Sequence, residues 1–192
     1  MSALESANKI KAKFGELVAE PVEFRGEISL KIAEPERVAD VCSYAKRELG
    51  FDYLVDISSV DNYGEDPRWT VVYNLRAIDN GTEIRLKVDV NEEKSELPSV
   101  LPVWRTANWH EREIYDMMGI RFKGHPDLRR ILMWEGYPYH PLRKDFPLAG
   151  KPTDLPGVAF TKPAPLEGGP FVTIPSSGDA IGREPRVRTP EN

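Results

Sequence analysis

Apolar side chains recur at helical spacing in two stretches of the N-terminal third of the chain. Residues 3–15 place them on overlapping faces, which predicts a short amphipathic helix. A second apolar stripe runs through residues 35–49, with Pro35 at the favoured first-turn position and Gly50 after the last periodic residue. We therefore expect a second helix that ends at Gly50.

Alternation of apolar and polar positions predicts strands between and after these helices. Residues 22–32 alternate on both sides of Gly26, which indicates a hairpin. Three further strand-like runs follow, at residues 51–63, 69–78 and 82–90. The turn before the last run contains Asn80 and Gly81, which accept the positive φ of a tight hairpin. The pattern predicts an α+β domain, mainly an antiparallel sheet backed by helices.

A third helix is predicted at residues 109–118. Asn108 is a favourable N-cap, and Glu111 stands three residues later, as in a capping box. Gly119 follows as a left-handed stop.

The composition changes near the C-terminus, where 11 of the 17 prolines lie beyond residue 135. We expect a folded domain at residues 1–142 and an extended Pro- and Gly-rich arm at residues 143–192. Large apolar side chains recur along the arm, which favours docking on a partner. Simple disorder is the alternative for residues 143–175, and it is expected for residues 176–192. The recurring apolar residues are Phe146, Leu155, Val158, Phe160, Phe171, Val172 and Ile174.

Charge and cysteine content exclude several classes of protein. The net charge of −5 argues against general binding to nucleic acid or anionic membranes. A single cysteine, Cys42, excludes a disulfide framework and an iron–sulfur cluster held by this chain alone, and we expect it in the core. The N-terminus does not resemble a signal peptide, and no apolar run is long enough for a transmembrane helix.

Residues 109–147 hold all three histidines and many acids and arginines, which raises the question of catalysis. His110, His125 and His140 are evenly spaced, but Ile114 stands where the H-E-x-x-H zinc motif requires its second histidine. A metal site is therefore disfavoured.

Two other kinds of site are also disfavoured. Glu113 and Asp116 share a helix face and are candidates for acid–base chemistry, but the sequence shows no nucleophile beside a base. Arg129 and Arg130 could bind phosphate or partner carboxylates, yet no glycine-rich phosphate loop is present.

Interaction with another protein explains the same residues better. Arginine, tryptophan and tyrosine are typical of interfaces, and prolines limit the freedom of a docking segment. The residues in question are Arg129, Arg130, Trp134, Tyr137, Tyr139 and Arg143.

The run from His110 to Leu148 resembles the signature of the 30 kDa (C) subunit of respiratory complex I (NADH:quinone oxidoreductase). Residues 15–110 fit the α+β domain of that family by the order of their elements. The resemblance marks these residues as a structural, partner-binding signature: Glu111, Glu113, Asp116, Gly119, His125, Pro126, Asp127, Arg129, Arg130, His140, Pro141, Arg143, Lys144, Asp145 and Phe146. We expect ion pairs of Arg129, Arg130 and Arg143 to hold the segment, some of them with the helix carboxylates.

The resemblance implies a role without chemistry of the chain's own. Members of the family are non-catalytic subunits of the peripheral arm, on the cytoplasmic face of the bacterial membrane. The implied partners are the 49 kDa (D) subunit, the cluster-bearing B subunit and, as a further candidate, the I subunit. The assembled complex contains FMN and iron–sulfur clusters and passes electrons from NADH to quinone while it translocates protons, whereas no cofactor is expected in this chain.

Two alternatives stay open. The chain could be the equivalent subunit of a related membrane-bound hydrogenase or of a complex with another electron donor. A free-standing metal hydrolase that uses the three histidines is the more distant possibility.

Overall fold

The computed structural model describes residues 2–148 of the chain. The chain consists of two units, residues 1–136 and residues 137–192. The first unit is an α+β domain, and the described residues of the second, 137–148, form turns and no helix or strand. Most of the expected arm lies outside the described residues, so its boundary at residue 143 and its docking stay predictions.

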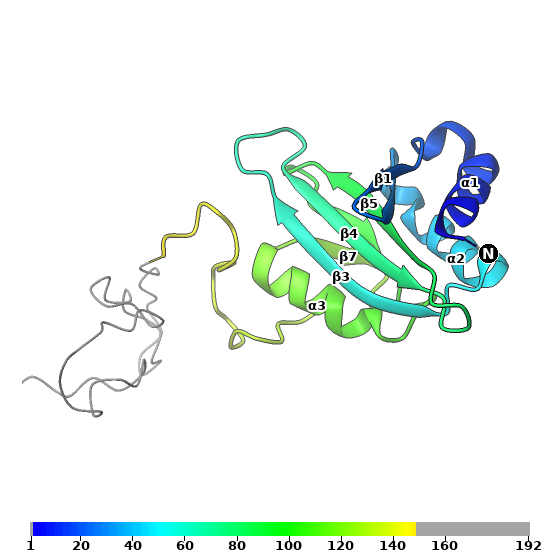
Figure 1. Cartoon of the computed structure of the whole chain (residues 1–192). Helices are drawn as coiled ribbons and strands as arrows, with labels where there is room; N and C mark the ends of the chain where they lie inside the picture. Colours follow the sequence, from blue (N-terminus) through cyan, green and yellow to red (C-terminus); the bar gives the residue numbers. More distant parts are fainter. Residues whose placement is uncertain (1, 149–192) are drawn as a thin grey trace, which may run out of the picture. The chain divides into compact units, whose positions relative to one another are not determined.

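Helix α1 spans Ala3–Phe14, as the apolar spacing predicts (Figure 1). It begins with a capping box, in which the Ser2 hydroxyl accepts a hydrogen bond from the Glu5 amide and the Glu5 carboxylate accepts one from the Ser2 amide. A short 3₁₀ helix, η1 (Gly15–Leu17), follows it.

Helix α2 spans Val38–Leu49 and is preceded by a 3₁₀ turn, η2 (Pro35–Arg37). Its end at Gly50 is confirmed, since this glycine has the left-handed φ of 77°. One stripe of the helix is buried, and it consists of Val38, Val41, Cys42, Ala45 and Leu49. Within residues 2–148, none of the helices is long and apolar enough to cross a membrane.

Five strands form the main sheet. They are β1 (Val22–Phe24), β2 (Glu27–Ile32), β3 (Tyr53–Asp61), β4 (Trp69–Arg76) and β5 (Glu83–Val90). The spatial order is β1-β2-β5-β4-β3, and all neighbours are antiparallel except β2 and β5. The mainly antiparallel sheet is confirmed. The parallel pair arises because α2 and the β3–β4 hairpin intervene between β2 and β5, so the chain crosses over before it returns beside β2.

The strands alternate between a buried and a more exposed face. Ile84, Leu86, Val88 and Val90 of β5 are buried, while the residues between them are half-exposed. Helices α1 and α2 lie together on one side of the sheet, and a third helix lies along the edge strand β3 (Figure 1). Buried side chains from the sheet and all three helices join in one continuous core.

The third helix, α3 (Ala107–Met118), lies between two short strands in the sequence. These strands, β6 (Glu96–Pro98) and β7 (Arg121–Lys123), pair in parallel as a second small sheet. Gly119 closes α3 with a φ of 80°, so the predicted left-handed stop is confirmed.

The predicted N-terminus of α3 is wrong. The helix begins at Ala107 after Thr106, whose side chain makes no capping bond, and Asn108 lies within the first turn. Glu111 does not reach back to cap the helix, because its carboxylate is used elsewhere in the buried interior.

Candidate partner-docking site

Helix α3 carries three charged side chains that are almost completely withdrawn from water. Glu111 and Asp116 have no exposed surface, and Arg112 is 6 % exposed. Charged groups are rarely buried unless nearby partners satisfy them. The partners of all three belong to irregular segments of the same chain, one before the helix and one after it.

Glu111 fixes the segment before the helix. Its carboxylate accepts hydrogen bonds from the Ser99 hydroxyl at 2.6 Å and from the Val100 amide at 2.7 Å, and the Leu101 amide in turn donates to the Ser99 hydroxyl at 3.1 Å. Burial raises the pKa of Glu111 to about 7, although these two hydrogen bonds to the carboxylate oppose the rise. Hydrogen bonds, and not an ion pair, thus hold this carboxylate.

The surroundings of Glu111 are apolar and chemically inert. Cys42 is fully buried, as predicted for a core residue. Burial, with a smaller contribution from the Glu111 charge, raises the pKa of the Cys42 thiol, so the thiol stays protonated and is a poor nucleophile. Burial likewise raises the pKa of Tyr73.

Asp116 fixes the segment after the helix. One of its oxygens accepts hydrogen bonds from the amides of Ile131, Leu132 and Met133 at 3.0, 2.7 and 2.8 Å. The other oxygen accepts from the Arg130 guanidinium at 2.5 Å. Burial alone would raise the pKa of Asp116, but these donors outweigh it, so the pKa lies below its ordinary value.

Arg112 binds the same segment through backbone carbonyl oxygens. Its guanidinium donates to the carbonyl oxygens of Arg129 at 3.2 Å and Arg130 at 3.0 Å. It also lies 5.3 Å from the centre of the Trp109 ring, a cation–π distance. Residues 129–133, whose backbone is bound by Arg112 and by the aspartate one turn further along α3, are called the clamped segment below.

The expected ion pairs of this region are found in part. Arg130 pairs with Asp116, one of the helix carboxylates expected as candidate internal partners. Arg129 pairs instead with Asp127 at 2.8 Å on the surface, where such pairs contribute little to stability. Glu113 is exposed while Asp116 is buried, so these two carboxylates do not form the shared site that their spacing suggested.

His125 links the start of this loop to α3. Its Nδ1 accepts a hydrogen bond from the Asp127 amide at 3.1 Å, so the ring proton is on Nε2, which lies 3.4 Å from the Asn108 carbonyl oxygen. Burial lowers the pKa of His125, and the charge of Arg112 adds to this effect. The neighbouring Pro126 is exposed. Because the His125 ring contacts backbone groups of the chain itself, its role is structural.

The second unit contains the remaining signature residues. Tyr139 packs against Tyr137 and Phe146, with ring centres 5.6 and 6.0 Å apart. The Arg143 amide donates to the His140 carbonyl at 3.2 Å and closes a turn. Pro141, Lys144 and Asp145 lie in the same stretch. The part that these residues play in partner binding stays a prediction.

The histidines do not converge on a metal site in the part of the chain that the structure describes. His110 lies 3.5 Å from the carboxylate of Asp56 on β3, whereas His125 is engaged with the backbone of its own loop. Among residues 2–148, no three His, Cys, Asp or Glu side chains come together as metal ligands would.

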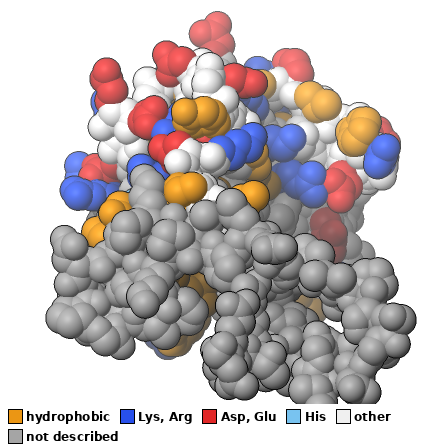
Figure 2. Space-filling model, turned by 90° about the vertical axis from the view of Figure 1, so that its left-hand side faces the viewer, with side chains coloured by type: hydrophobic (Ala, Val, Ile, Leu, Met, Phe, Trp, Pro, Cys, Tyr) orange, Lys and Arg blue, Asp and Glu red, His pale blue; other side chains and the backbone are white. Residues whose placement is uncertain are grey.

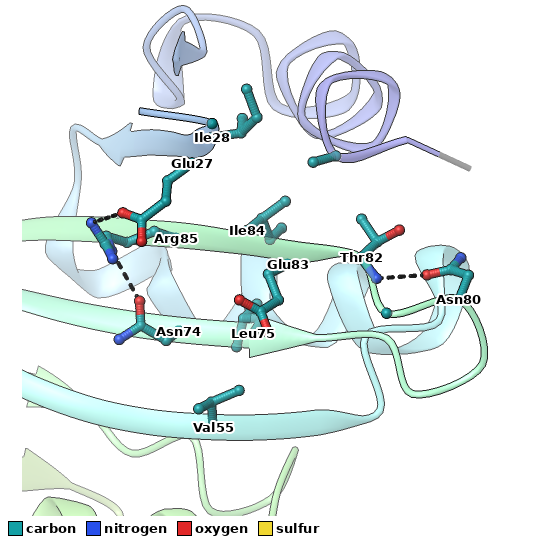
Figure 3. A pocket seen from close by; sticks show the side chains of 13 residues that line it. Glu27, Ile28, Val55, Asn74, Leu75, Asn80, Thr82, Glu83, Ile84 and Arg85 are labelled. Atoms are coloured by element: carbon teal, nitrogen blue, oxygen red, sulfur yellow. Dashed lines mark hydrogen bonds and ion pairs between the residues drawn. The ribbon is translucent and has the colours of Figure 1, made fainter. Parts of the chain in front are cut away.

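A hollow of about 580 Å³ lies between the β1–β2 and β4–β5 turns (Figure 3). Its charged side chains pair across the sheet: Arg85 binds Glu27 at 2.8 Å and the Asn74 side chain at 2.9 Å. Glu83 pairs with Arg76 at 3.2 Å. These pairs stabilise neighbouring strands, and they do not form the convergent set of groups that a reaction needs.

Large apolar side chains are exposed beside the buried charges of α3. Trp109 is 59 % exposed and Leu132 is 62 % exposed. On the face shown in Figure 2, hydrophobic side chains lie beside those of lysine and arginine. Exposed aromatic, aliphatic and arginine side chains on a fixed framework are typical of a protein–protein interface.

Comparison with known proteins agrees with the resemblance seen in the sequence. Residues 32–152 match the family described as "Respiratory-chain NADH dehydrogenase, 30 Kd subunit". The chain is 47 % identical over 142 residues to the C subunit of NADH-quinone oxidoreductase from Geotalea uraniireducens. This match covers 74 % of this chain and 86 % of that protein. It is 43 % identical over 171 residues to a C subunit, numbered 2, of the same enzyme from Rhizobium etli. That match covers 87 % of this chain and 90 % of the relative.

Two solved structures share the fold. A trypsin-resistant fragment (1-134) of Nqo5 superposes with a TM-score of 0.56 and 33 % identity, covering 66 % of this chain and 99 % of that one. A chain of an archaeal respiratory membrane complex, the membrane-bound sulfane sulfur reductase, superposes with a TM-score of 0.64 and 22 % identity over 75 % of this chain and 85 % of that one. The family match covers more than half of the sequence, and the chain belongs to the family of the 30 kDa subunit of respiratory-chain NADH dehydrogenase.

Proposed function

We propose that this chain is a non-catalytic structural subunit of the peripheral arm of NADH:quinone oxidoreductase. One observation carries the proposal. The buried charges of α3, which are the strongest candidates for chemistry, bind backbone and hydroxyl groups of the chain itself. They hold two irregular segments in one shape, and the one after the helix is at the surface. Such a fixed surface suits docking, and the charged groups are not directed at a substrate as catalytic groups would be.

The relatives support the assignment by name and by length. Proteins that match most of this chain are named as C subunits of NADH-quinone oxidoreductase. In that complex, electrons pass from NADH through FMN and iron–sulfur clusters to quinone, and protons are translocated. The cofactors belong to other subunits, in agreement with a single buried cysteine in this chain.

The partners follow from the same assignment. The 49 kDa (D) subunit is the principal one, with the cluster-bearing B subunit and the I subunit as neighbours. This chain then lies on the cytoplasmic face of the membrane and is attached only through the complex. Both the clamped segment and the aromatic turn at residues 137–148 contact the partner, and the chain beyond them extends along it.

The electron donor of the complex is a separate matter. The fold also occurs in a respiratory complex of another kind, the archaeal sulfane sulfur reductase. The second candidate function is therefore that of the equivalent subunit in a related membrane-bound hydrogenase or in a complex with another electron donor. Purification of the intact complex and assay with NADH would separate the two.

Assembly and turnover distinguish a structural subunit from a catalytic one. Cells that carry the chain truncated after Pro147, in place of the full chain, should contain less assembled complex on native gels. The complex that does assemble should reduce quinone at a near-normal rate per particle. Normal assembly with abolished turnover would show instead that the removed residues take part in the chemistry.

A further inference from the structure

The clamped segment turns one large apolar side chain outward. Leu128, just before the segment, and Met133, at its end, pack against the hydrophobic core. Leu132, next to Met133, is 62 % exposed. The apolar positions that secure the segment are thus taken by other residues, and Leu132 does not contribute to the core.

Leu132 is exposed on a fixed backbone, not on a loose loop. Its own amide donates to Asp116 at 2.7 Å, and the amides on either side donate to the same oxygen. Arg112 holds the two carbonyls at the start of the segment. A side chain presented by such a backbone loses little conformational freedom when it enters a partner, which favours tight binding.

Exposed charged and aromatic side chains on the same segment and on α3 indicate the chemistry of the partner. The segment also presents Arg129, whose side chain is 66 % exposed and pairs with the exposed Asp127. Such a surface pair exchanges readily for another carboxylate. Trp109 stands 59 % exposed beside Arg112, on the helix that holds the segment.

We infer that Leu132 is an anchor of the interface, and that it enters an apolar pocket on the partner subunit whose rim offers a carboxylate to Arg129. This inference rests on the proposed function and specifies the contact by which the chain docks. Arg112 and Asp116 act as positioning residues, because they hold the backbone of the anchor and do not touch the partner.

The chain offers a matched control for this side chain. Ile78, in the turn between β4 and β5, is also 62 % exposed. Leu132→Ala and Ile78→Ala therefore remove similar amounts of exposed apolar surface, and both variants should keep the thermal midpoint of the full chain. Leu132→Asp and Ile78→Asp repeat the comparison with a larger change, because each substitution introduces a charge.

The binding of each full-length variant to the purified 49 kDa-type subunit is measured by biolayer interferometry. Leu132→Ala should raise the dissociation constant about 10-fold or more, as for an anchor residue, and Leu132→Asp should raise it further. The Ile78 variants should bind like the unaltered chain. Assembled complex in cells should fall in the same order.

Three outcomes would overturn the inference. The first is unchanged binding of both Leu132 variants. The proposed function is judged separately, by whether the unaltered chain binds the subunit and whether loss of the chain prevents assembly. Equal weakening by the Ile78 variants would show that the effect is not local. A dimer of the unaltered chain that Leu132→Ala dissociates would assign the residue to contact with a second copy.

Discussion

The charged residues of α3 act on backbone and hydroxyl groups more than on one another. Glu111 binds a hydroxyl and an amide before the helix, and Asp116 binds three amides and a guanidinium after it. The two carboxylates differ in pKa for the same reason. Asp116 has enough donors to offset its burial, whereas Glu111 does not.

Glu111 should make the stability of the fold depend on pH. Its pKa is raised from 4.5 to about 7 in the folded state. Below the lower value, the carboxyl is protonated in both states. Between the two values, only the unfolded state releases the proton, so the free energy of unfolding falls as the pH rises, by an amount of the order of 3 kcal/mol.

Glu111→Gln should remove this dependence, because the amide has no proton to release. The thermal midpoint of the unaltered chain should fall between about pH 5 and about pH 8, and that of the variant should fall less. Glu113→Gln, at an exposed position on the same helix, is the control and should behave like the unaltered chain. Identical pH profiles for all three proteins would contradict the assignment of Glu111 as the titrating group.

At the scale of elements, α3 depends on the residue that follows it to end correctly. Gly119 has a φ of 80°, a region that β-branched residues resist. Gly119→Val should lower the free energy of unfolding by about 1–2 kcal/mol or more, measured by denaturant titration. Gly119→Asn should cost much less, since asparagine tolerates this conformation. Equal losses for both substitutions would point to a cause other than the backbone angle.

The clamp on residues 129–133 should be visible in hydrogen exchange. Asp116→Asn preserves the shape but removes the charge and replaces one of the two acceptor oxygens by a donor, so either the amides of residues 131–133 or the Arg130 guanidinium lose their acceptor. We expect these amides to exchange roughly 10-fold faster or more in the variant. Asp127→Asn alters only an exposed pair and serves as the control. Unchanged protection at the three amides would show that the clamp is not what orders the segment.

Elements whose local signals agree could be predicted from the sequence. In α2, the apolar spacing, the proline before it and Gly50 after it all indicate the same boundaries. The start of α3 could not be predicted, because the local pattern of Asn108 and Glu111 competes with a tertiary use of the glutamate. Its partners, Ser99 and Val100, precede the helix and carry no local signal that identifies them.

The proposed docking site shows the same division between what the local sequence indicates and what the tertiary structure decides. The density of arginine and aromatic residues in the sequence indicates its position, which stays a prediction. The roles within it could not be predicted, since an arginine can pair inside the chain or outside it with the same sequence. Arg130 proved to be internal and Arg129 exposed. The parallel pairing of β2 and β5 was likewise invisible, because alternation describes the faces of a strand and not its neighbours.

For the whole molecule, the core and most of the proposed docking residues fall in different parts of the chain. Every side chain of the continuous buried core lies between Ala7 and Phe122. Of the residues described after Phe122, only Leu128 and Met133 pack against the edge of that core. The fold therefore supports the clamped segment, and the clamped segment supplies partners for Arg112 and Asp116 on α3.

This dependence predicts two truncations with different outcomes. A chain of residues 1–136 retains the core and the four donors to Asp116 from residues 130–133. It should therefore unfold cooperatively near the thermal midpoint of the full chain, as followed by circular dichroism. A chain of residues 1–128 lacks these four donors, and because loss of the partners of a buried charge is strongly destabilising, it should be less stable by about 3–5 kcal/mol. The trypsin-resistant fragment (1-134) of Nqo5 shows that a relative of this fold persists as a fragment without the rest of its chain. If residues 1–136 failed to fold, the remainder of the chain would be part of the stabilising core. If the two truncated chains were equally stable, the donors to Asp116 would be dispensable, and the clamp would then be a consequence of docking and not its preparation.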